Sequence, residues 1–391
     1  MEARRDFRLL FAGRVLRAFG FGFAAILLGI HLQSRGLAPG EVGLVLAVGL
    51  AAGSLTGLVS AAPAGKYGRR RALAATGVLM AVCGLILAFA SSPWLLVLAG
   101  LTGMMGVANT DVGPFLAVEQ AILAQTASPQ QRNRAFARYS LSGALAGAAG
   151  GLAAGAATGL IRTQAFFLLF AVLGVATAIV PLLLSPGVEG EPDAPVFGSL
   201  RPLLGLSALF ALDSLGGGLV VNSVVVYWLH IRFGASPAVL GPTFAAMSLL
   251  AALSFELSGR IADRIGLVRT MVLTHLPSSL LLLTIPFAPG LGWAIALLLV
   301  RASMQSMDVP ARQAYVVSIV KPAERSGALA FTGAVRGIAQ SFGPAITGAA
   351  IQAAALSIPF LLAGSIKSTY DVALYFGFRR RFGDHEVGIG R

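Results

Sequence analysis

Long apolar stretches separated by short polar gaps are the feature that most constrains how this chain can fold. Residues 42–64 and 72–90 contain no charged residue, whereas the gap between them contains Lys66, Arg69, Arg70 and Arg71. A membrane-spanning helix needs about 20 predominantly apolar residues. Only 12% of the 391 residues are charged, about half the share in a soluble domain. We therefore predict a polytopic membrane protein.

The apolar stretches predict twelve spanning helices. Their expected ranges are 9–33, 40–63, 70–91, 93–122, 134–158, 164–185, 203–230, 237–258, 268–288, 291–319, 326–352 and 355–377. The least hydrophobic linker, 186–202, divides them into two groups of six. We therefore expect an N-terminal bundle at 1–185, a cytoplasmic linker at 186–202, and a C-terminal bundle with a short tail at 203–391.

The distribution of cations predicts the orientation. With the N-terminus inside, only Arg35, Arg162 and Arg232 fall in predicted outer loops, and most other Lys and Arg residues fall on the inner side. Cytoplasmic loops of membrane proteins carry such an excess of Lys and Arg. We therefore expect a multi-pass protein of the cell inner membrane with both termini in the cytoplasm.

Composition and motifs exclude several other classes. The net charge of +13 lies in short loops rather than on a basic face with interleaved aromatic residues, so no nucleic-acid partner is expected. The single cysteine, Cys83, excludes a disulfide within the chain. Motifs typical of metalloproteases, serine hydrolases and P-loop enzymes are missing. The four histidines lie towards predicted helix ends or in the tail rather than in a cluster. We expect no enzyme activity, no cofactor and no metal site.

Three stretches of the first half recur in the second at a nearly constant spacing. AGKYGRRRA (64–72) matches ADRIGLVRT (262–270), and LAPGEVG (37–43) matches ASPAVLG (235–241), both at a spacing of 198 residues. NTDVGP (109–114) matches SMDVPA (306–311) at 197. The chain is therefore interpreted as a duplicated six-helix unit. Gly68 and Gly266 would suit tight reversals between helices, because glycine tolerates conformations that other residues avoid.

The pattern G-x-x-x-[DE]-[RK]-x-G-[RK]-[RK] between helices 2 and 3, with a weaker copy between helices 8 and 9, is typical of the major facilitator superfamily. The chain resembles this family over essentially its full length. The second copy, beginning at Gly259, has Asp263, Arg264 and Gly266. The first copy has Lys66, Gly68, Arg69 and Arg70, but it has Ala61 in place of the glycine and Gly65 in place of the acid.

The resemblance implies an all-α membrane fold of two six-helix bundles related by a pseudo-two-fold axis. It also implies that these signature residues form gates. In the family, the acid of the signature lies near a helix N-terminus of the opposite half, where the helix dipole favours negative charge. Asp263 is therefore expected near residues 133–136, whereas Gly65 offers nothing equivalent to the start of helix 11.

Charged residues inside the predicted helices are the candidate functional groups. An ionisable residue at membrane depth costs about 2.5–3.5 kcal/mol on insertion scales, so it usually marks a pathway. The cavity and coupling candidates are Arg17, Asp111, Asp213, Arg301, Asp308 and Arg336. Lys367 and Asp371 also lie within helix 12. Arg14, Glu119 and Glu256 are set aside because they lie close to inner helix ends.

Helix 10 carries the densest set of these charges. Arg301 and Asp308 are seven residues apart, nearly on one helix face, and Asp308 and Arg312 are four apart. Pro310 should break the helix locally, as is typical of helices at binding sites. We expect Arg301 to be the partner of Asp308. Arg312 and Asp371 are interpreted as structural ion pairs.

The functional interpretation is that the aspartates accept protons or cations and that Arg17 and Arg301 balance them. Burial in a low dielectric generally raises the pKa of a carboxyl group. We expect a monomeric secondary transporter that moves a small solute through the lipid bilayer with protons, with efflux by antiport as the first interpretation. Proton-coupled uptake and a non-transporting solute sensor of the same fold are the alternatives. The arginines would suit an anionic solute, but they could equally pair with the aspartates.

Overall fold

The computed structural model describes residues 2–59, 67–107, 115, 118–119, 122–123, 132–157, 159–160, 162–189, 201–320 and 325–378. These residues form α-helices and short 3₁₀ helices without a β-strand, which confirms the all-α class. Contacts divide the chain into two compact units. Unit 1 comprises Met1–Ala194, Val221–Ala246 and Pro344–Ala354; unit 2 comprises Pro195–Val220, Met247–Gly343 and Ala355–Arg391. The expected bundle boundaries at 186–202 stay a prediction.

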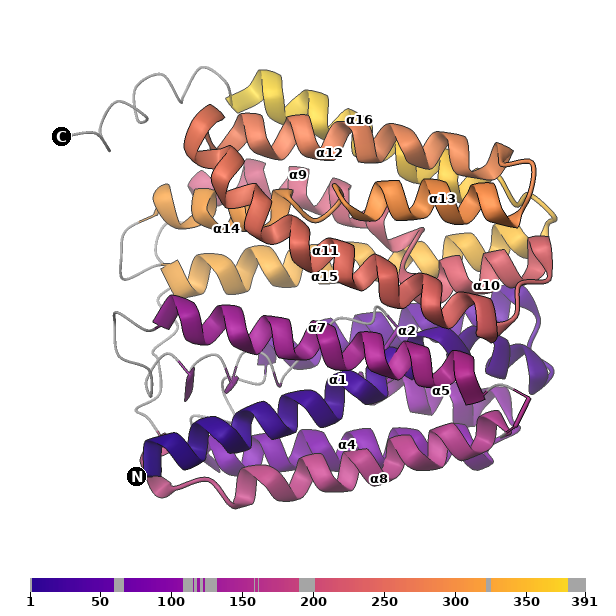
Figure 1. Ribbon diagram of the computed structural model, residues 1–391, viewed down its shortest axis with the longest axis vertical. Helices are drawn as coiled ribbons and strands as arrows, with labels where there is room; N and C mark the ends of the chain where they lie inside the picture. The colour runs from indigo at the N-terminus through magenta and orange to yellow at the C-terminus, as the bar shows by residue number, and fades with distance from the viewer. Residues whose placement is uncertain are drawn as a thin grey trace. The chain divides into compact units, whose positions relative to one another are not determined.

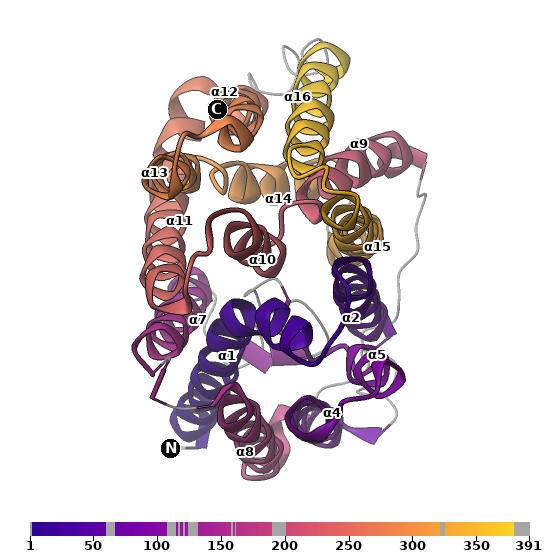
Figure 2. The same ribbon diagram turned by 90° about the vertical axis from the view of Figure 1, so that its right-hand side faces the viewer.

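Unit 1 is built around the first helix of the chain. Its helices are α1 (Glu2–Ser34), α2 (Pro39–Val59), α4 (Arg69–Phe89), α5 (Pro93–Leu101), α7 (Arg132–Ala157), α8 (Thr163–Leu182), η1 (Pro186–Val188) and α10 (Asn222–Phe233). Helix α1 lies between α7 and α8, and α4 lies alongside α8 (Figures 1 and 2). Gly77 and Gly84 of α4 contact Ala178 and Ala171 of α8, and these small residues let the two backbones approach closely.

Unit 2 contains the remaining helices. They are α9 (Arg201–Gly218), most of α11 (Pro237–Ile265), α12 (Leu267–Thr284), η2 (Ile285–Phe287), α13 (Leu291–Ala302), α14 (Asp308–Ser318), most of α15 (Arg325–Gln352) and α16 (Ile358–Phe378). Helix α16 packs against both α9 and α12 (Figure 2). Phe210, Met271, Tyr315 and Tyr370 belong to one buried apolar cluster, which joins α9, α12, α14 and α16.

Eight helical segments of the described residues are long and apolar enough to cross a membrane. Two of the predicted spans are interrupted in the structure. The predicted span 203–230 is broken between α9 and α10, where Gly216, Gly217 and Gly218 precede a short turn. The predicted span 291–319 is broken between α13 and α14 (Figure 1). The predicted span 93–122 is helical as α5 only to Leu101, and most of its second half lies outside the described residues.

Pro310 explains the position of the break in the predicted tenth helix. The interruption lies at 303–307, before the proline rather than at it. Proline clashes with the carbonyl group four residues earlier but is tolerated in the first turn of a helix. Helix α14 begins at Asp308, so Pro310 falls in its first turn. The prediction of a break was correct, and its position is displaced by about one turn.

The predicted glycine reversals are confirmed. Gly68 is the N-cap of α4 with φ 93°, and Gly266 is the N-cap of α12 with φ 86°. Both have ψ near the extended range, at 146° and 161°, a region that is essentially restricted to glycine. The repeated positions Gly68 and Gly266 therefore also share a backbone conformation.

A second pair of repeated positions makes equivalent contacts within unit 1. At the start of α2, Gly43 packs directly on Gly348 near the end of α15. At the start of α11, the equivalent Gly241 packs on Gly155 near the end of α7. At each place a Cβ atom would overlap the facing backbone. Gly155 of α7 and Gly348 of α15 therefore lie where two helix backbones pack closely.

Candidate functional site

Asp213 on α9 is the centre of a buried group of charges in unit 2. Its Oδ1 lies 2.5 Å from Lys367 Nζ of α16 and 3.5 Å from His275 Nε2 of α12. Its Oδ2 lies 3.8 Å from Arg312 Nη1 of α14 and 3.9 Å from Arg336 Nη2 of α15. Only 4% of the Asp213 side chain is exposed. One carboxylate therefore holds cations from several helices together.

His275 links Asp213 to a second carboxylate, that of Asp371. His275 Nδ1 lies 2.8 Å from Asp371 Oδ1, and the Ser279 hydroxyl donates to Asp371 Oδ2 at 3.1 Å. Lys367 Nζ lies 3.4 Å from His275 Nε2. Since an ammonium group can only donate, Nε2 accepts from Lys367 and Nδ1 donates to Asp371. A continuous polar connection thus runs from Asp213 through Lys367 and His275 to Asp371. The expectation that the histidines lie outside any cluster was wrong for His275.

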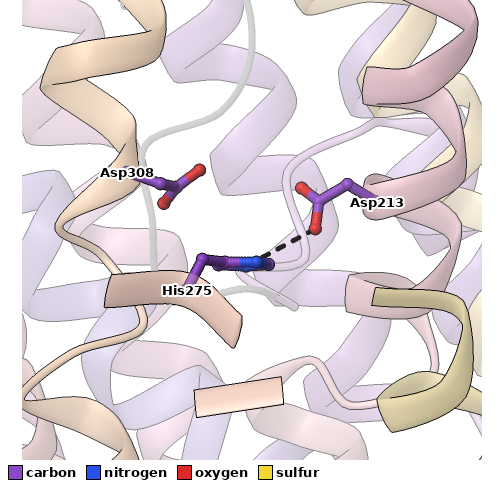
Figure 3. A group of neighbouring side chains, drawn as sticks. All are labelled: Asp213, His275 and Asp308. Atoms are coloured by element: carbon purple, nitrogen blue, oxygen red, sulfur yellow. Dashed lines mark ion pairs between the residues drawn. The ribbon is translucent and has the colours of Figure 1, made fainter. Parts of the chain in front are cut away.

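Asp308 pairs with Arg312 rather than with Arg301. Arg312 Nη1 donates to Asp308 Oδ2 at 2.5 Å, one helical turn away within α14. The seven-residue spacing to Arg301 would have placed both residues on one face of a continuous helix, but the break at 303–307 removes that relationship. The predicted pairing was therefore wrong. Figure 3 shows the carboxyl group of Asp308 facing Asp213 and His275.

Arg301 is buried without a close acidic partner. The residue is 6% exposed, and its Nε atom has no hydrogen-bond partner among the described residues. Asp213 attracts it electrostatically, but no described carboxylate oxygen lies within the 4 Å that defines an ion pair. Arg301 occupies the last turn of α13, where the helix dipole favours a cation.

Arg336 is the most exposed member of the group. A third of its side chain (33%) is exposed, although it lies towards the middle of α15. Its Nε donates to the Ser214 hydroxyl at 2.9 Å, next to Asp213 in the chain. An arginine at such depth normally faces a water-filled cavity or other protein groups rather than lipid. Arg336 is thus the member through which solutes could reach Asp213.

Unit 1 contains a separate buried ion pair. Arg17 Nη1 and Nη2 of α1 lie 3.0 and 2.7 Å from the two carboxylate oxygens of Glu119. The Tyr139 hydroxyl of α7 donates to the same carboxylate, and Arg17 lies over the ring of Phe115. Glu119 is 3% exposed, so setting it aside as a residue near a helix end was wrong. Arg17 is balanced by this glutamate.

The ligand atoms of Asp213, His275 and Asp308 lie within 4.8 Å of one another, a spacing that could suit a metal ion. Their present partners argue against one. Lys367 and Arg312 each occupy a carboxylate oxygen that a metal would need, and their positive charges would repel a cation. The donor set therefore fits a network of ion pairs better than a metal centre.

The first signature copy contacts the C-terminal end of α8. Arg70 donates to the carbonyls of Leu182 and Pro181, where the negative end of the helix dipole favours cations. Glu189 accepts from the backbone N–H groups of Arg69 and Arg70, at 2.5 and 3.3 Å. It therefore places a carboxylate at the start of α4, next to the signature copy that lacks its own acid.

The other signature residues are only partly described. Lys66 and Gly65 lie outside the described residues, as does the coupling candidate Asp111. Asp263 falls within α11, but its side chain is outside what the structure describes, as are those of residues 133–134 and 136. Arg264 is an exposed residue at the end of α11. The predicted contact of Asp263 with the start of helix 5 stays a prediction.

One known protein family matches the chain over most of its length. Residues 10–231 and 206–387 match the family model described as Major Facilitator Superfamily. The chain belongs to the Major Facilitator Superfamily. It is a multi-pass membrane protein of a family of transporters, which confirms the expectation that it is not an enzyme.

Several known proteins resemble the chain over almost its whole length. The "Uncharacterized membrane protein YJR124C" of Saccharomyces cerevisiae is 26% identical over 95% of this chain and 94% of its own. The human organic anion transporter MFSD10 (TETRAN) has a TM-score of 0.68 and 17% identity, covering 96% of this chain and 100% of its own. A D-xylose-proton symporter has a TM-score of 0.76 and 13% identity, covering 96% and 98%. These structural likenesses show the fold.

The residues around Asp213, namely Lys367, His275, Arg312, Arg336, Asp308, Asp371 and Arg301, are called the Asp213 cluster below. The sequence contained signals for several of its members, and these signals were undervalued. Lys367 and Asp371 are four residues apart, and so share a helix face. His275 was interpreted as lying towards a helix end, although it is about two helical turns inside the predicted span 268–288. The pairing of Arg17 with Glu119 had no local signal, since 102 residues separate them.

Proposed function

We propose that this superfamily member is a secondary active transporter that moves a small solute by alternating access and couples the movement to protons. The observation that carries the proposal is the Asp213 cluster. It combines buried carboxylates, a histidine and cations within membrane-spanning helices, and Arg336 gives it an exposed end. Ionisable groups placed in this way in transporters usually serve substrate or proton pathways.

The partners of Asp213 explain how coupling could arise. The carboxylate stays ionised while Lys367, Arg312 and Arg336 surround it, because opposite charges favour the charged form. A change that moves one of these cations away would favour protonation. His275, which contacts both Lys367 and Asp371, offers a second proton-binding group in the same network.

Two directions of coupling are proposed. Efflux by antiport, the interpretation drawn from the sequence, requires the solute and the proton to compete for one carboxylate. Uptake by symport requires them to bind together. One observation favours symport: Asp213 and Asp308 each contact a cation, and Asp371 contacts His275, so a cationic solute would have to compete with these partners for a carboxylate.

Localisation and assembly follow from the same interpretation. The cation distribution supports a location in the cell membrane with both termini in the cytoplasm, and we propose that the protein acts as a monomer. Single cysteines at Pro192 and Pro289, in a variant lacking Cys83, test the orientation with an impermeant thiol reagent. Labelling from outside is expected at position 289 and not at 192, and the reverse pattern would overturn the orientation.

Proteoliposomes containing a pH-sensitive dye test transport and coupling together. Sugars, nucleosides, amino acids and carboxylates are added outside, one at a time, and internal pH is followed. Acidification indicates symport and alkalinisation indicates antiport. A solute that binds the purified protein but produces neither flux nor a pH change would contradict the proposal and favour the solute sensor.

A further inference from the structure

The charges of the Asp213 cluster do not balance among the described residues. Asp213, Asp308 and Asp371 supply the negative charges, and Arg301, Arg312, Arg336 and Lys367 supply the positive ones. The cluster is net positive with neutral His275 and more so when His275 is protonated. An uncompensated buried charge is costly. An anion would therefore be stabilised here.

Two arginines of the cluster are only weakly paired with its carboxylates. Arg301 is buried, and its Nε lacks a hydrogen-bond partner among the residues that the structure describes. Arg336 touches Asp213 only at 3.9 Å, whereas Lys367 lies 2.5 Å from the same carboxylate. A guanidinium group presents several N–H donors in a fixed plane, a geometry that matches a carboxylate or a phosphate. By contrast, Lys367 and Arg312 each lie 2.5 Å from a carboxylate oxygen.

We propose that the transported solute is a small organic anion, that Arg336 binds its negatively charged group, and that Arg301 supplies a second positive charge to the cluster around Asp213. The proposal rests on the transport function proposed above and names the class of solute that the same site takes. Arg336 receives the anion first because a third of its side chain is exposed. Arg301, being buried, provides a compensating positive charge nearby.

Anion binding at Arg336 would also favour proton binding at Asp213, which is the coupling expected of a symporter. An anion at Arg336 weakens that arginine's attraction for Asp213 and adds a like charge nearby, and both effects favour the protonated carboxyl group. The anion and the proton therefore bind cooperatively, and by linkage each increases the affinity for the other. The charged and titratable groups that act on Asp213 are Arg301, Arg312, Arg336, Lys367, His275, Asp308, Tyr370 and Asp371.

The test uses probes of one shape and different charge. Benzoate, benzamide and benzylamine share a ring and differ in their charge, and phenyl phosphate offers a second anionic group. Binding is measured by the thermal shift of the detergent-purified full-length protein. Benzoate or phenyl phosphate is expected to raise the melting temperature, while benzamide and benzylamine leave it unchanged.

Arginine variants then locate the site. Arg336→Gln is expected to weaken anion binding by about 10- to 100-fold, the loss expected for one charge-assisted hydrogen bond. Arg269→Gln, which changes an exposed arginine of α12, is the matched control and should bind normally. If the Arg301→Gln protein is already unfolded without ligand, Arg301→Lys is used in its place. Lysine retains the positive charge but lacks the planar guanidinium group.

The pH dependence provides a readout that a purely structural arginine would not change. Anion affinity should increase as the pH is lowered in the wild type, and this increase should be smaller in Asp213→Asn, because the proton linked to Asp213 is lost. Stabilisation by neither anion would overturn the proposal. Stronger binding of benzamide or benzylamine than of the two anions would also overturn it. So would wild-type anion affinity in both Arg301→Gln and Arg336→Gln. These measurements need no membrane, so their failure is distinguishable from a failure of proton-coupled transport.

Discussion

Asp213 and Lys367 form a buried ion pair, with 2.5 Å between Oδ1 and Nζ and with at most 7% of either side chain exposed. The two residues come from α9 and α16, 154 positions apart in the chain. Lys367 also contacts His275, which holds Asp371. Each charge of this network therefore depends on the others for compensation.

Removing one member of this pair should destabilise the protein more than removing both. Asp213→Asn leaves Lys367 charged and buried, at an expected cost of about 3–5 kcal/mol, whereas a matched apolar replacement of a whole pair is often nearly neutral. Asp213→Asn/Lys367→Met should therefore recover much of the loss. Unfolding in mixed detergent micelles measures this difference. A double variant as unstable as the sum of the singles would contradict the pairing.

The Arg17–Glu119 pair of unit 1 should behave in the same way. Arg17→Met leaves Glu119 and the Tyr139 hydroxyl without their cation, and we expect a loss of about 3–5 kcal/mol. Arg17→Met/Glu119→Leu should be markedly more stable than Arg17→Met alone. Arg138→Met, at an exposed position of α7, controls for the substitution itself. Equal stability of Arg17→Met and Arg138→Met would show that the ion pair contributes little.

The two signature glycines should resist substitution for the same backbone reason. Gly68→Ala and Gly266→Ala force alanine into a region that is essentially restricted to glycine, at about 1–3 kcal/mol each. At Gly68 the added Cβ would also lie 2.9 Å from Glu189 Oε1, so the Glu189 side chain would have to shift. Gly333→Ala in α15 is the control: its Cβ meets nothing within 4 Å, so a gain of about 0.5–1 kcal/mol is expected. Equal unfolding free energies for all three variants would contradict the assignment.

Glu189 should protect the start of α4. Glu189→Leu removes the acceptor for the amides of Arg69 and Arg70, a cap worth about 0.5–2 kcal/mol, and Glu189→Gln removes only the charge. Hydrogen exchange followed by mass spectrometry should show faster exchange at the start of α4, most in the leucine variant. The start of α12 is the internal control. Unchanged exchange at α4 in both variants would show that the contact is not maintained in solution.

The apolar runs predicted most spanning helices because hydrophobic length alone determines which segments can cross a bilayer. The glycine reversals were also predictable, since their conformation is a local property of the chain. The break after Gly218 was missed because the long apolar run was interpreted as one span, although three consecutive glycines, Gly216, Gly217 and Gly218, weaken a helix. The partner of Arg17 was missed for a different reason: it depends on which helices become neighbours, which is not encoded locally. The partner of Asp308 had a local signal in its four-residue spacing to Arg312, but the seven-residue spacing to Arg301 was preferred.

Accumulation and exchange of one solute, compared in proteoliposomes, test the central proposal that Asp213 couples transport to protons. The comparison uses the wild type, Asp213→Asn/Lys367→Met and the exposed control Arg269→Gln, with a solute identified by the binding screen. Asp308→Asn, also predicted to lose coupling, completes the set. The double variant is expected to exchange solute across the membrane at a measurable rate but to lose accumulation driven by a pH gradient, while Arg269→Gln retains both. Undiminished pH-driven accumulation in the double variant would contradict the proposal.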